Sequence, residues 1–210
     1  MIQTSSIDVS AASIDKGPTP IVFVQRFTVT RIFTGQVANT ERKNMNVLHV
    51  AQVNIGQMKA ALEDPVMAGF VARLDEINAL ADGSPGFVWR LQTNDGNATY
   101  LRPYDDDRIL FNMSVWESIE QLKRYVYYTA HVEVLRQRQA WFEKFSGAYT
   151  ALWWIPKGHV PGIDEAKKRL AHLEAHGPTP FAFTFKDVFP ADEQFAKSTD
   201  WSSFKPCTAT

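Results

Sequence analysis

Four residues with polar or aromatic side chains stand out in an otherwise apolar stretch. The segment NMSVWESIEQLKRYVYYTAHVEVLRQRQAWF (112–142) contains Asn112, Ser114, Trp116 and His131. The first three alternate along a strand-like sequence, so they share one face of that strand. An amide N–H can bind a developing oxyanion, and an imidazole can act as a general base. These residue types and spacings indicate a cavity in which a small molecule could be bound and deprotonated.

Six elements are expected to position these side chains, in the order strand, helix, strand, strand, helix, strand. Asp64 fits a helix N-cap followed by Pro65, Gly83 fits a helix end, and Ser118 with Gln121 forms a capping box. The second helix has an irregular register near YTAH. The strands are predicted at 47–55, 86–93, 109–116 and 149–156, and the helices at 64–82 and 118–145.

This order predicts an α+β fold of the ferredoxin-like split βαβ type, with helices on one face of an antiparallel sheet. An extra amphipathic helix (162–177) and a last strand (181–189) are predicted at the C-terminal side. The second sheet face also has to be covered, and in such folds a second copy of the chain often covers it. A homodimer is therefore expected.

Strand alternation sorts the sheet residues into an apolar face and a mixed face. We expect the apolar face to pack on the two main helices, with a shared cluster of Phe70, Leu74, Phe87, Trp89, Phe111 and Met113. On the mixed face, away from those helices, lie Gln52, Asn54, Arg90, Gln92, Asn112, Ser114 and Trp116. Two interpretations stay open for this face: a small-molecule cavity with apolar walls, or a solvated surface or dry dimer contact.

The polar groups of the mixed face have candidate functions. Arg90 could hold a carboxylate or enolate by bidentate hydrogen bonds, or reach water from the sheet edge. Asn54 and Asn112 could donate to an oxyanion, or bond each other or a buried water. His131 could be a base, or a histidine of the core or of a dimer contact. The expected substrate-binding residues are Arg90, Gln52, Asn112 and Ser114.

Composition argues against several other classes of protein. Lys and Arg number 22 against 23 Asp and Glu, so no nucleic-acid partner is expected. No apolar run reaches the roughly 20 residues that cross a bilayer, and no secretory signal pattern begins the chain. Cys207 is the single cysteine, which favours a reducing, cytoplasmic setting. His172 and His176 lack the glutamate of the zinc-protease motif, so no metal site is expected.

The chain divides into three parts. The domain is predicted at 46–190, and 191–210 is a polar tail. Residues 1–45 leave two interpretations open. They form an N-terminal extension, disordered or adding an edge strand, or they lie upstream of a true start at Met45.

Three blocks carry a resemblance to a known family: HVAQVNIGQMKAALEDPVMAGFVARLDEINALADGSPGFVWRLQT, ILFNMSVWESIEQLKRYVYYTAHVEVLRQRQAWF and HGPTPFAFTF. The domain resembles the DUF3291 family, a domain of unknown function, and its architecture is similar to the dimeric α/β-barrel superfamily. That superfamily includes antibiotic-biosynthesis monooxygenases, haem-degrading oxygenases and polyketide cyclases. The resemblance to haem-degrading members implies catalytic roles for Asn54, Trp116 and His131. Haem is then the alternative to a site without a cofactor.

Two functions follow as hypotheses. The first is a cofactor-independent monooxygenase or cyclase that acts on a hydrophobic, aromatic or polyketide-like substrate. The second is a non-catalytic ligand-binding or structural dimer. An enzyme requires a cavity into which the side chain of Arg90, Asn54 or His131 points. A structural dimer requires the mixed face of the sheet to be packed without water.

Overall fold

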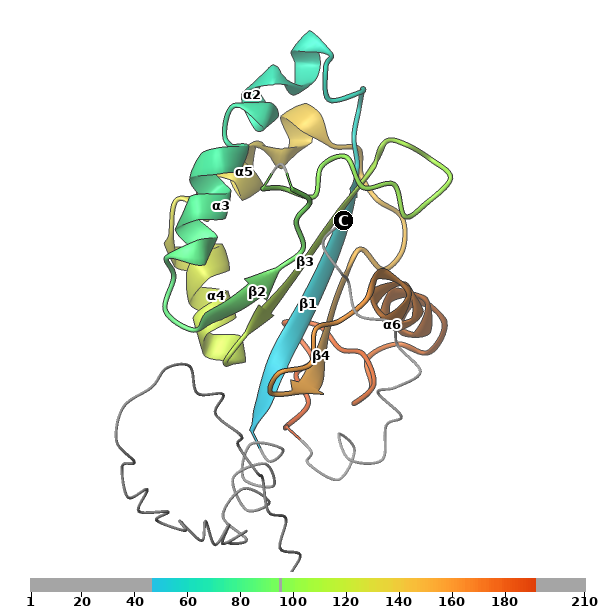
Figure 1. The fold of residues 1–210 in the computed structure, drawn as a ribbon. Helices are drawn as coiled ribbons and strands as arrows, with labels where there is room; N and C mark the ends of the chain where they lie inside the picture. Colours follow the sequence, from blue (N-terminus) through green and yellow to red (C-terminus); the bar gives the residue numbers. More distant parts are fainter. Residues whose placement is uncertain (1–46, 95, 192–210) are drawn as a thin grey trace, which may run out of the picture. The chain divides into compact units, whose positions relative to one another are not determined.

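The computed structural model describes residues 47–94 and 96–191 (Figure 1). The predicted extension at 1–45 and the tail beyond residue 191 lie outside the described residues. The strands are β1 Leu48–Gln57, β2 Phe87–Arg90, β3 Ile109–Trp116 and β4 Thr150–Pro156. The helices are the 3₁₀ helix η1 Pro65–Met67, α2 Ala68–Val71, α3 Leu74–Asp82, α4 Ile119–Tyr128, α5 His131–Trp141 and α6 Ile163–His176.

The four strands form one antiparallel sheet in the order β2-β3-β1-β4. The predicted α+β class and the antiparallel sheet are confirmed. Asn54 in β1 lies opposite Asn112 in β3 and opposite Thr150 in β4. Gln52 lies opposite Ser114 in the same way. The register therefore lines up polar residues of three adjacent strands on one sheet face.

Both main helices begin at the predicted caps. The Asp64 carboxylate accepts the Val66 N–H at 2.8 Å, and the Ser118 hydroxyl oxygen accepts the Gln121 N–H at 3.3 Å. Capping of this kind satisfies backbone N–H groups that a first helical turn leaves unpaired. The first predicted helix is divided, however, into η1, α2 and α3, with a break before Leu74.

The second predicted helix is also divided, at Thr129. Its hydroxyl donates to the Tyr125 carbonyl at 2.6 Å and accepts the His131 N–H at 3.2 Å. A threonine side chain that bonds nearby backbone competes with the helical hydrogen bonds, and Thr129 adopts an extended conformation. His131 is therefore the first residue of α5 rather than a residue one or two turns into a continuous helix.

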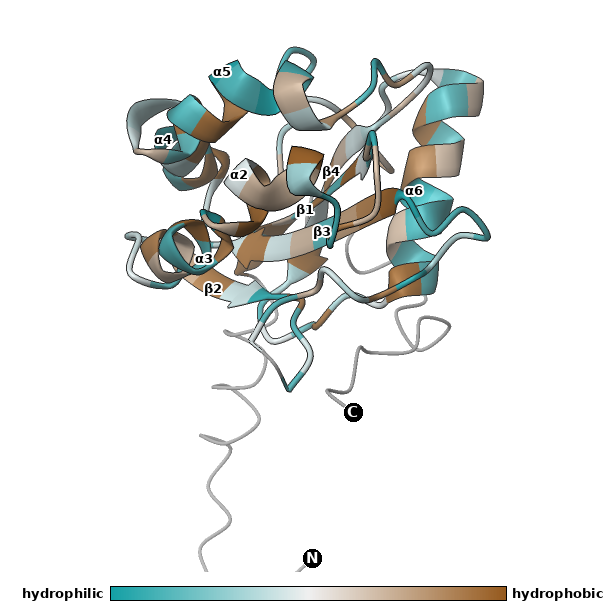
Figure 2. Cartoon of the chain, turned by 90° about the horizontal axis from the view of Figure 1, so that it is seen from above, coloured by the Kyte–Doolittle hydropathy of each residue, from teal (hydrophilic) through white to brown (hydrophobic). Residues whose placement is uncertain are grey.

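The C-terminal helix α6 covers the apolar face of the sheet, opposite to α2–α5 (Figure 2). Leu170 and Leu173 share a buried cluster with Phe111 and Met113, and Trp89 packs against it. Trp89 therefore points away from both main helices. The prediction that this face packs on the two main helices is wrong.

The main helices lie over the mixed face instead. Ala81 of α3 and Leu122 of α4 share a buried cluster with Val50 and Trp116. Alternation shows which residues share a face, but not which helix buries that face, and α6 supplies its own amphipathic stripe. Helices of the same chain thus pack on both faces of the sheet. The expected homodimer stays a prediction. The six residues predicted to cluster together are divided among three clusters, with Phe70 and Leu74 in one, Phe87 in the second, and Trp89, Phe111 and Met113 in the third.

A register shift in β2 explains where two of these residues lie. Phe87 pairs with Trp116, but Trp89 pairs with Val115 and Arg90 with Ser114. Such a bulge changes the side on which the next side chains point. Phe87 and Arg90 therefore lie on the helix-covered face, whereas simple alternation placed Phe87 with Trp89.

The predicted last strand at 181–189 does not form. Phe183 makes a single bridge to Leu152 of β4, with N–H···O distances of 2.8 and 2.9 Å in the two directions. Phe183 is fully buried, so this one contact fastens the C-terminal segment to the sheet edge. No helix in the described ranges has the length and apolar character that crossing a membrane requires.

Candidate small-molecule site

A cavity of about 930 Å³ lies between the mixed face of the sheet and helices α2–α5. This volume falls within the range of small-molecule sites. The predicted location on the face away from the main helices is wrong, because α3 and α5 contribute lining residues such as Ile77 and Val134. The structure nevertheless brings all seven predicted site residues to this one cavity: Gln52, Asn54, Arg90, Asn112, Ser114, Trp116 and His131.

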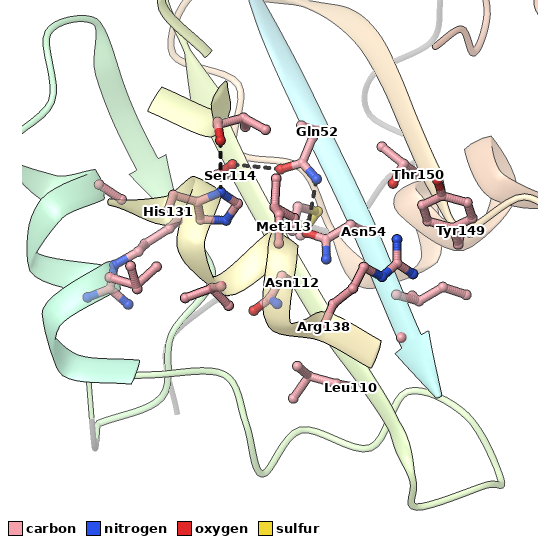
Figure 3. A pocket seen from close by; sticks show the side chains of 18 of the residues that line it. Gln52, Asn54, Leu110, Asn112, Met113, Ser114, His131, Arg138, Tyr149 and Thr150 are labelled. Carbon is pink, nitrogen blue, oxygen red and sulfur yellow. Dashed lines mark hydrogen bonds between the residues drawn. The ribbon is translucent and has the colours of Figure 1, made fainter. Parts of the chain in front are cut away.

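Four of these residues form a hydrogen-bonded chain across β3 and β1. Figure 3 shows its part from Ser114 through Gln52 to Asn54. Trp116 Nε1 lies 3.0 Å from Ser114 Oγ, Ser114 Oγ lies 3.1 Å from Gln52 Oε1, and Gln52 Nε2 lies 3.0 Å from Asn54 Oδ1. We call this chain the Trp116–Asn54 relay. Its members come from two strands, because the antiparallel register places Gln52 opposite Ser114.

The relay has a direction, because the indole N–H of Trp116 can only donate. Ser114 accepts that hydrogen bond and donates its own hydroxyl proton to the Gln52 carbonyl oxygen. The Gln52 amide N–H then donates to the Asn54 carbonyl oxygen. The N–H₂ group of Asn54 remains, without a hydrogen bond to any described residue. The relay therefore presents two amide protons to the cavity.

Within the relay, the predicted site residues differ in what they can contact. Trp116 is fully buried, and its indole N–H is used by Ser114. Gln52 and Ser114 line the cavity, but the Ser114 hydroxyl and the Gln52 carbonyl oxygen are hydrogen-bonded to each other. These three residues hold Asn54 in orientation, and their predicted substrate-binding or catalytic roles stay predictions.

His131 faces the cavity from α5 as a neutral imidazole. Its Nδ1 lies 3.2 Å from the Val126 carbonyl oxygen, which requires a proton on Nδ1 and leaves Nε2 unprotonated. Burial lowers the pKa of His131, although the bond to Val126 opposes this shift. Nε2 has no hydrogen-bond partner among the described residues. A neutral imidazole with a free nitrogen is the form that can accept a proton.

An aromatic stack fixes the His131 ring. The ring centroid of Tyr125 lies 4.8 Å from that of His131 and 5.0 Å from that of Trp116. Burial raises the pKa of Tyr125, so its hydroxyl stays protonated and donates to the Ile77 carbonyl at 3.3 Å. The same Trp116 that begins the relay therefore also supports the proposed base.

Arg90 lines the cavity, but its charge is compensated. Its guanidinium makes two hydrogen bonds to Asp82, at 2.8 and 3.1 Å, and a third to the Gly96 carbonyl at 2.7 Å. These contacts join β2 to α3 and to the following turn. Arg90 therefore has a structural role, and its predicted role in substrate binding stays a prediction.

Replacing Arg90 by alanine is expected to lower the free energy of unfolding by about 1–2 kcal/mol. Binding of the hydrophobic anion 8-anilinonaphthalene-1-sulfonate should change by less than about twofold. Thermal unfolding and fluorescence titration measure the two effects. The exposed Arg136, paired with Glu133 at 2.6 Å, gives the control variant Arg136→Ala. Tenfold weaker binding at an unchanged melting temperature would restore the ligand-binding role that the sequence predicted for Arg90.

Arg138 is a cavity residue that was not predicted from the sequence. It lies on α5, seven residues after His131, and lines the same cavity. Residues seven apart share one helix face, and Val134 and Leu135 between them also line the cavity. This helical spacing from His131 is the sequence signal that could have indicated Arg138.

The described residues include no group of three or more His, Cys, Asp or Glu side chains that could hold a metal ion. His172 Nε2 lies 2.9 Å from the Thr179 hydroxyl, and its ring lies 4.6 Å from that of His176. This pair belongs to α6, and neither histidine lines the cavity. The haem alternative stays a prediction.

In the comparison with protein families, residues 49–199 match a family described as "Domain of unknown function (DUF3291)". The chain belongs to the DUF3291 family. This membership confirms the family to which the sequence blocks pointed. No curated protein matches the chain.

Two solved structures share a partial likeness with this DUF3291 protein. One is SnoaB, a cofactor-independent oxygenase from Streptomyces nogalater, at 20% identity and a TM-score of 0.37 over 50% of this chain and 90% of that one. The other is a variant of the same oxygenase, at 17% identity and a TM-score of 0.36 over 53% and 95% of the two chains. Likeness at this level supports no statement about the reaction of this protein.

Proposed function

We propose that this cavity is the active site of an enzyme that deprotonates a hydrophobic, aromatic or polyketide-like molecule. His131 accepts the proton at Nε2, and the Asn54 N–H₂ group binds the oxyanion that forms. The observation that carries the proposal is that one cavity holds both a neutral buried imidazole and amide donors oriented by the Trp116–Asn54 relay. Preorganised donors of this kind stabilise charge that develops in a transition state.

The apolar lining suits such a substrate. Phe70, Leu74 and Ile77 of the helices face the cavity opposite the polar residues of the sheet. Exclusion of water by these walls strengthens the hydrogen bonds to the oxyanion. In a cyclase, the substrate anion attacks a carbonyl carbon of the same molecule, and the new alkoxide takes back the proton from His131. In a monooxygenase, the substrate anion reduces O₂ and forms a hydroperoxide, which loses water and leaves one oxygen atom on the oxidised carbon as a ketone. The substrate supplies the electrons in the second case.

Hydrogen–deuterium exchange tests the proposal without knowledge of the natural substrate. The probe is 2-tetralone, a bicyclic ketone with acidic C–H groups, followed in D₂O by proton NMR. We expect the wild-type protein to accelerate exchange and His131→Gln to lower the acceleration by about 10²–10⁴-fold. His172→Gln, outside the cavity lining, should leave the rate unchanged. Binding of 2-tetralone without faster exchange would favour the non-catalytic ligand-binding alternative.

The exchange rate should depend on the protonation of His131. The neutral form is the base, and burial lowers the pKa of His131 below its ordinary value of 6.5. The rate should therefore be constant above pH 7 and fall only as the pH drops below 6.5. A pH–rate profile in wild-type protein measures the inflection. An inflection above pH 6.5 would show that a different group is the base.

A further inference from the structure

We propose that Arg138 and Thr150 form an anion-binding subsite at one end of the cavity, so that the ligand carries a carboxylate, sulfonate or similar acidic group. The inference rests on the proposed function only in treating this ligand as the substrate. It gives that substrate an amphipathic character: an apolar body and one acidic end.

Arg138 differs from the other arginines of the cavity in lacking an acidic partner. Arg73 pairs with Glu76 at 3.1 Å, and Arg90 pairs with Asp82 at 2.8 Å. Arg138 makes no ion pair with any described residue. Its positive charge is therefore available to a ligand.

The position of Arg138 is fixed by an aromatic ring. Its guanidinium carbon lies 5.3 Å from the ring centroid of Tyr149, a distance typical of a cation–π contact. Figure 3 shows the Arg138 side chain directed toward Tyr149 and Thr150. Because a guanidinium presents its donors in one plane, this orientation suits bidentate binding of an acidic group.

The sheet supplies a further donor beside Arg138. Thr150 of β4 lies opposite Asn54 of β1, and both line the cavity. The side chain of Thr150 makes no hydrogen bond to any other described residue. A hydroxyl that remains unengaged next to an unpaired cation can donate to the same anion. Asn54 lies between Thr150 and the β3 residues of the relay, and so separates the acidic end of the ligand from the reacting end.

The basic side chains of the cavity lining are not equivalent. Arg73 and Arg90 are paired with carboxylates, whereas Arg138 is not. The one carboxylate in the lining, that of Glu174, accepts the backbone N–H of Ala148. The opposite end is formed by the apolar surfaces of Trp116 and Tyr125. An aromatic body against those rings would place its acidic group toward Arg138.

A matched pair of probes tests the subsite. 8-Anilinonaphthalene-1-sulfonate and N-phenyl-1-naphthylamine have the same ring system, and only the first carries an anion. We expect Arg138→Met to weaken binding of the sulfonate at least tenfold, about 1.4 kcal/mol, and to change binding of the neutral amine by less than twofold. Arg138→Lys should retain part of the preference for the anion. Arg136→Met, on the same helix but paired with Glu133, should change neither affinity.

Fluorescence titration gives both dissociation constants, and thermal unfolding checks that the variants fold. An equal loss for both probes, unchanged sulfonate binding in Arg138→Met, or no sulfonate binding by the wild type would overturn the subsite. If Arg138→Met does not fold, the comparison of Arg138→Lys with the wild type decides. A preserved anion preference together with no exchange of 2-tetralone would reject the proposed function and leave the subsite intact.

Discussion

Replacing Asn54 by alanine is expected to slow the exchange of 2-tetralone by about 10²–10³-fold, the usual effect of removing one oxyanion donor. Asn54 is the end of the Trp116–Asn54 relay, and its N–H₂ group is the part of the relay that no described residue uses. The free energy of unfolding should change by about 1 kcal/mol or less, because a single half-buried hydrogen bond from Gln52 is lost.

Two neighbouring variants separate this role from general damage to the cavity. Asn112→Ala removes an amide directly opposite Asn54 that has no place in the relay, so the exchange rate of the neutral probe should fall less than tenfold. Ser114→Ala interrupts the relay before Gln52, so an intermediate loss is expected. Equal losses in Asn54→Ala and Asn112→Ala would show that orientation by the relay has no effect on the reaction.

The largest expected effect on stability concerns a buried ion pair within α6, at the surface where this helix packs on β4. Glu165 and Arg169 are both fully buried, with 3.3 Å between carboxylate and guanidinium. The Glu165 carboxylate also accepts the Trp153 indole N–H at 2.7 Å and lies 2.8 Å from His159 Nε2. Burial lowers the pKa of Arg169 to about 10, which still leaves it charged at neutral pH.

Glu165→Gln should therefore reduce the free energy of unfolding by about 3–5 kcal/mol, because it leaves the Arg169 charge buried without its counter-ion. At about 2–4 °C per kcal/mol for a chain of this size, the melting temperature should fall by roughly 6–20 °C. Glu133→Gln, in the exposed pair with Arg136, should cost at most about 1 kcal/mol. Equal melting temperatures for the two variants would mean that the buried pair does not anchor α6.

The sequence predicted the sheet and its polar face because both depend on local patterns. Strand alternation correctly grouped Gln52, Asn54, Asn112, Ser114 and Trp116 on one face, and helix capping located the starts at Asp64 and Ser118. These features depend only on residues close together in the sequence. They can therefore be predicted without knowledge of the tertiary structure.

The remaining errors come from contacts between distant elements. Alternation could not show that α6 takes the apolar face and leaves α2–α5 to enclose the cavity. The bulge in β2 places Phe87 on the helix side, and the ion pair of Arg90 with Asp82 was not predicted. Arg138, by contrast, shares a helical face with His131 and could have been found from the sequence.

The pKa of 2-naphthol bound in the cavity tests the central claim most directly. The naphtholate ion resembles the enolate of 2-tetralone, and absorbance against pH follows its ionisation in the complex. An apolar cavity without an oxyanion site disfavours the charged form and raises the pKa of the bound phenol. We predict that the wild-type protein lowers it below the value in free solution and that Asn54→Ala reverses the shift. A raised pKa in wild-type protein would contradict an oxyanion site at Asn54.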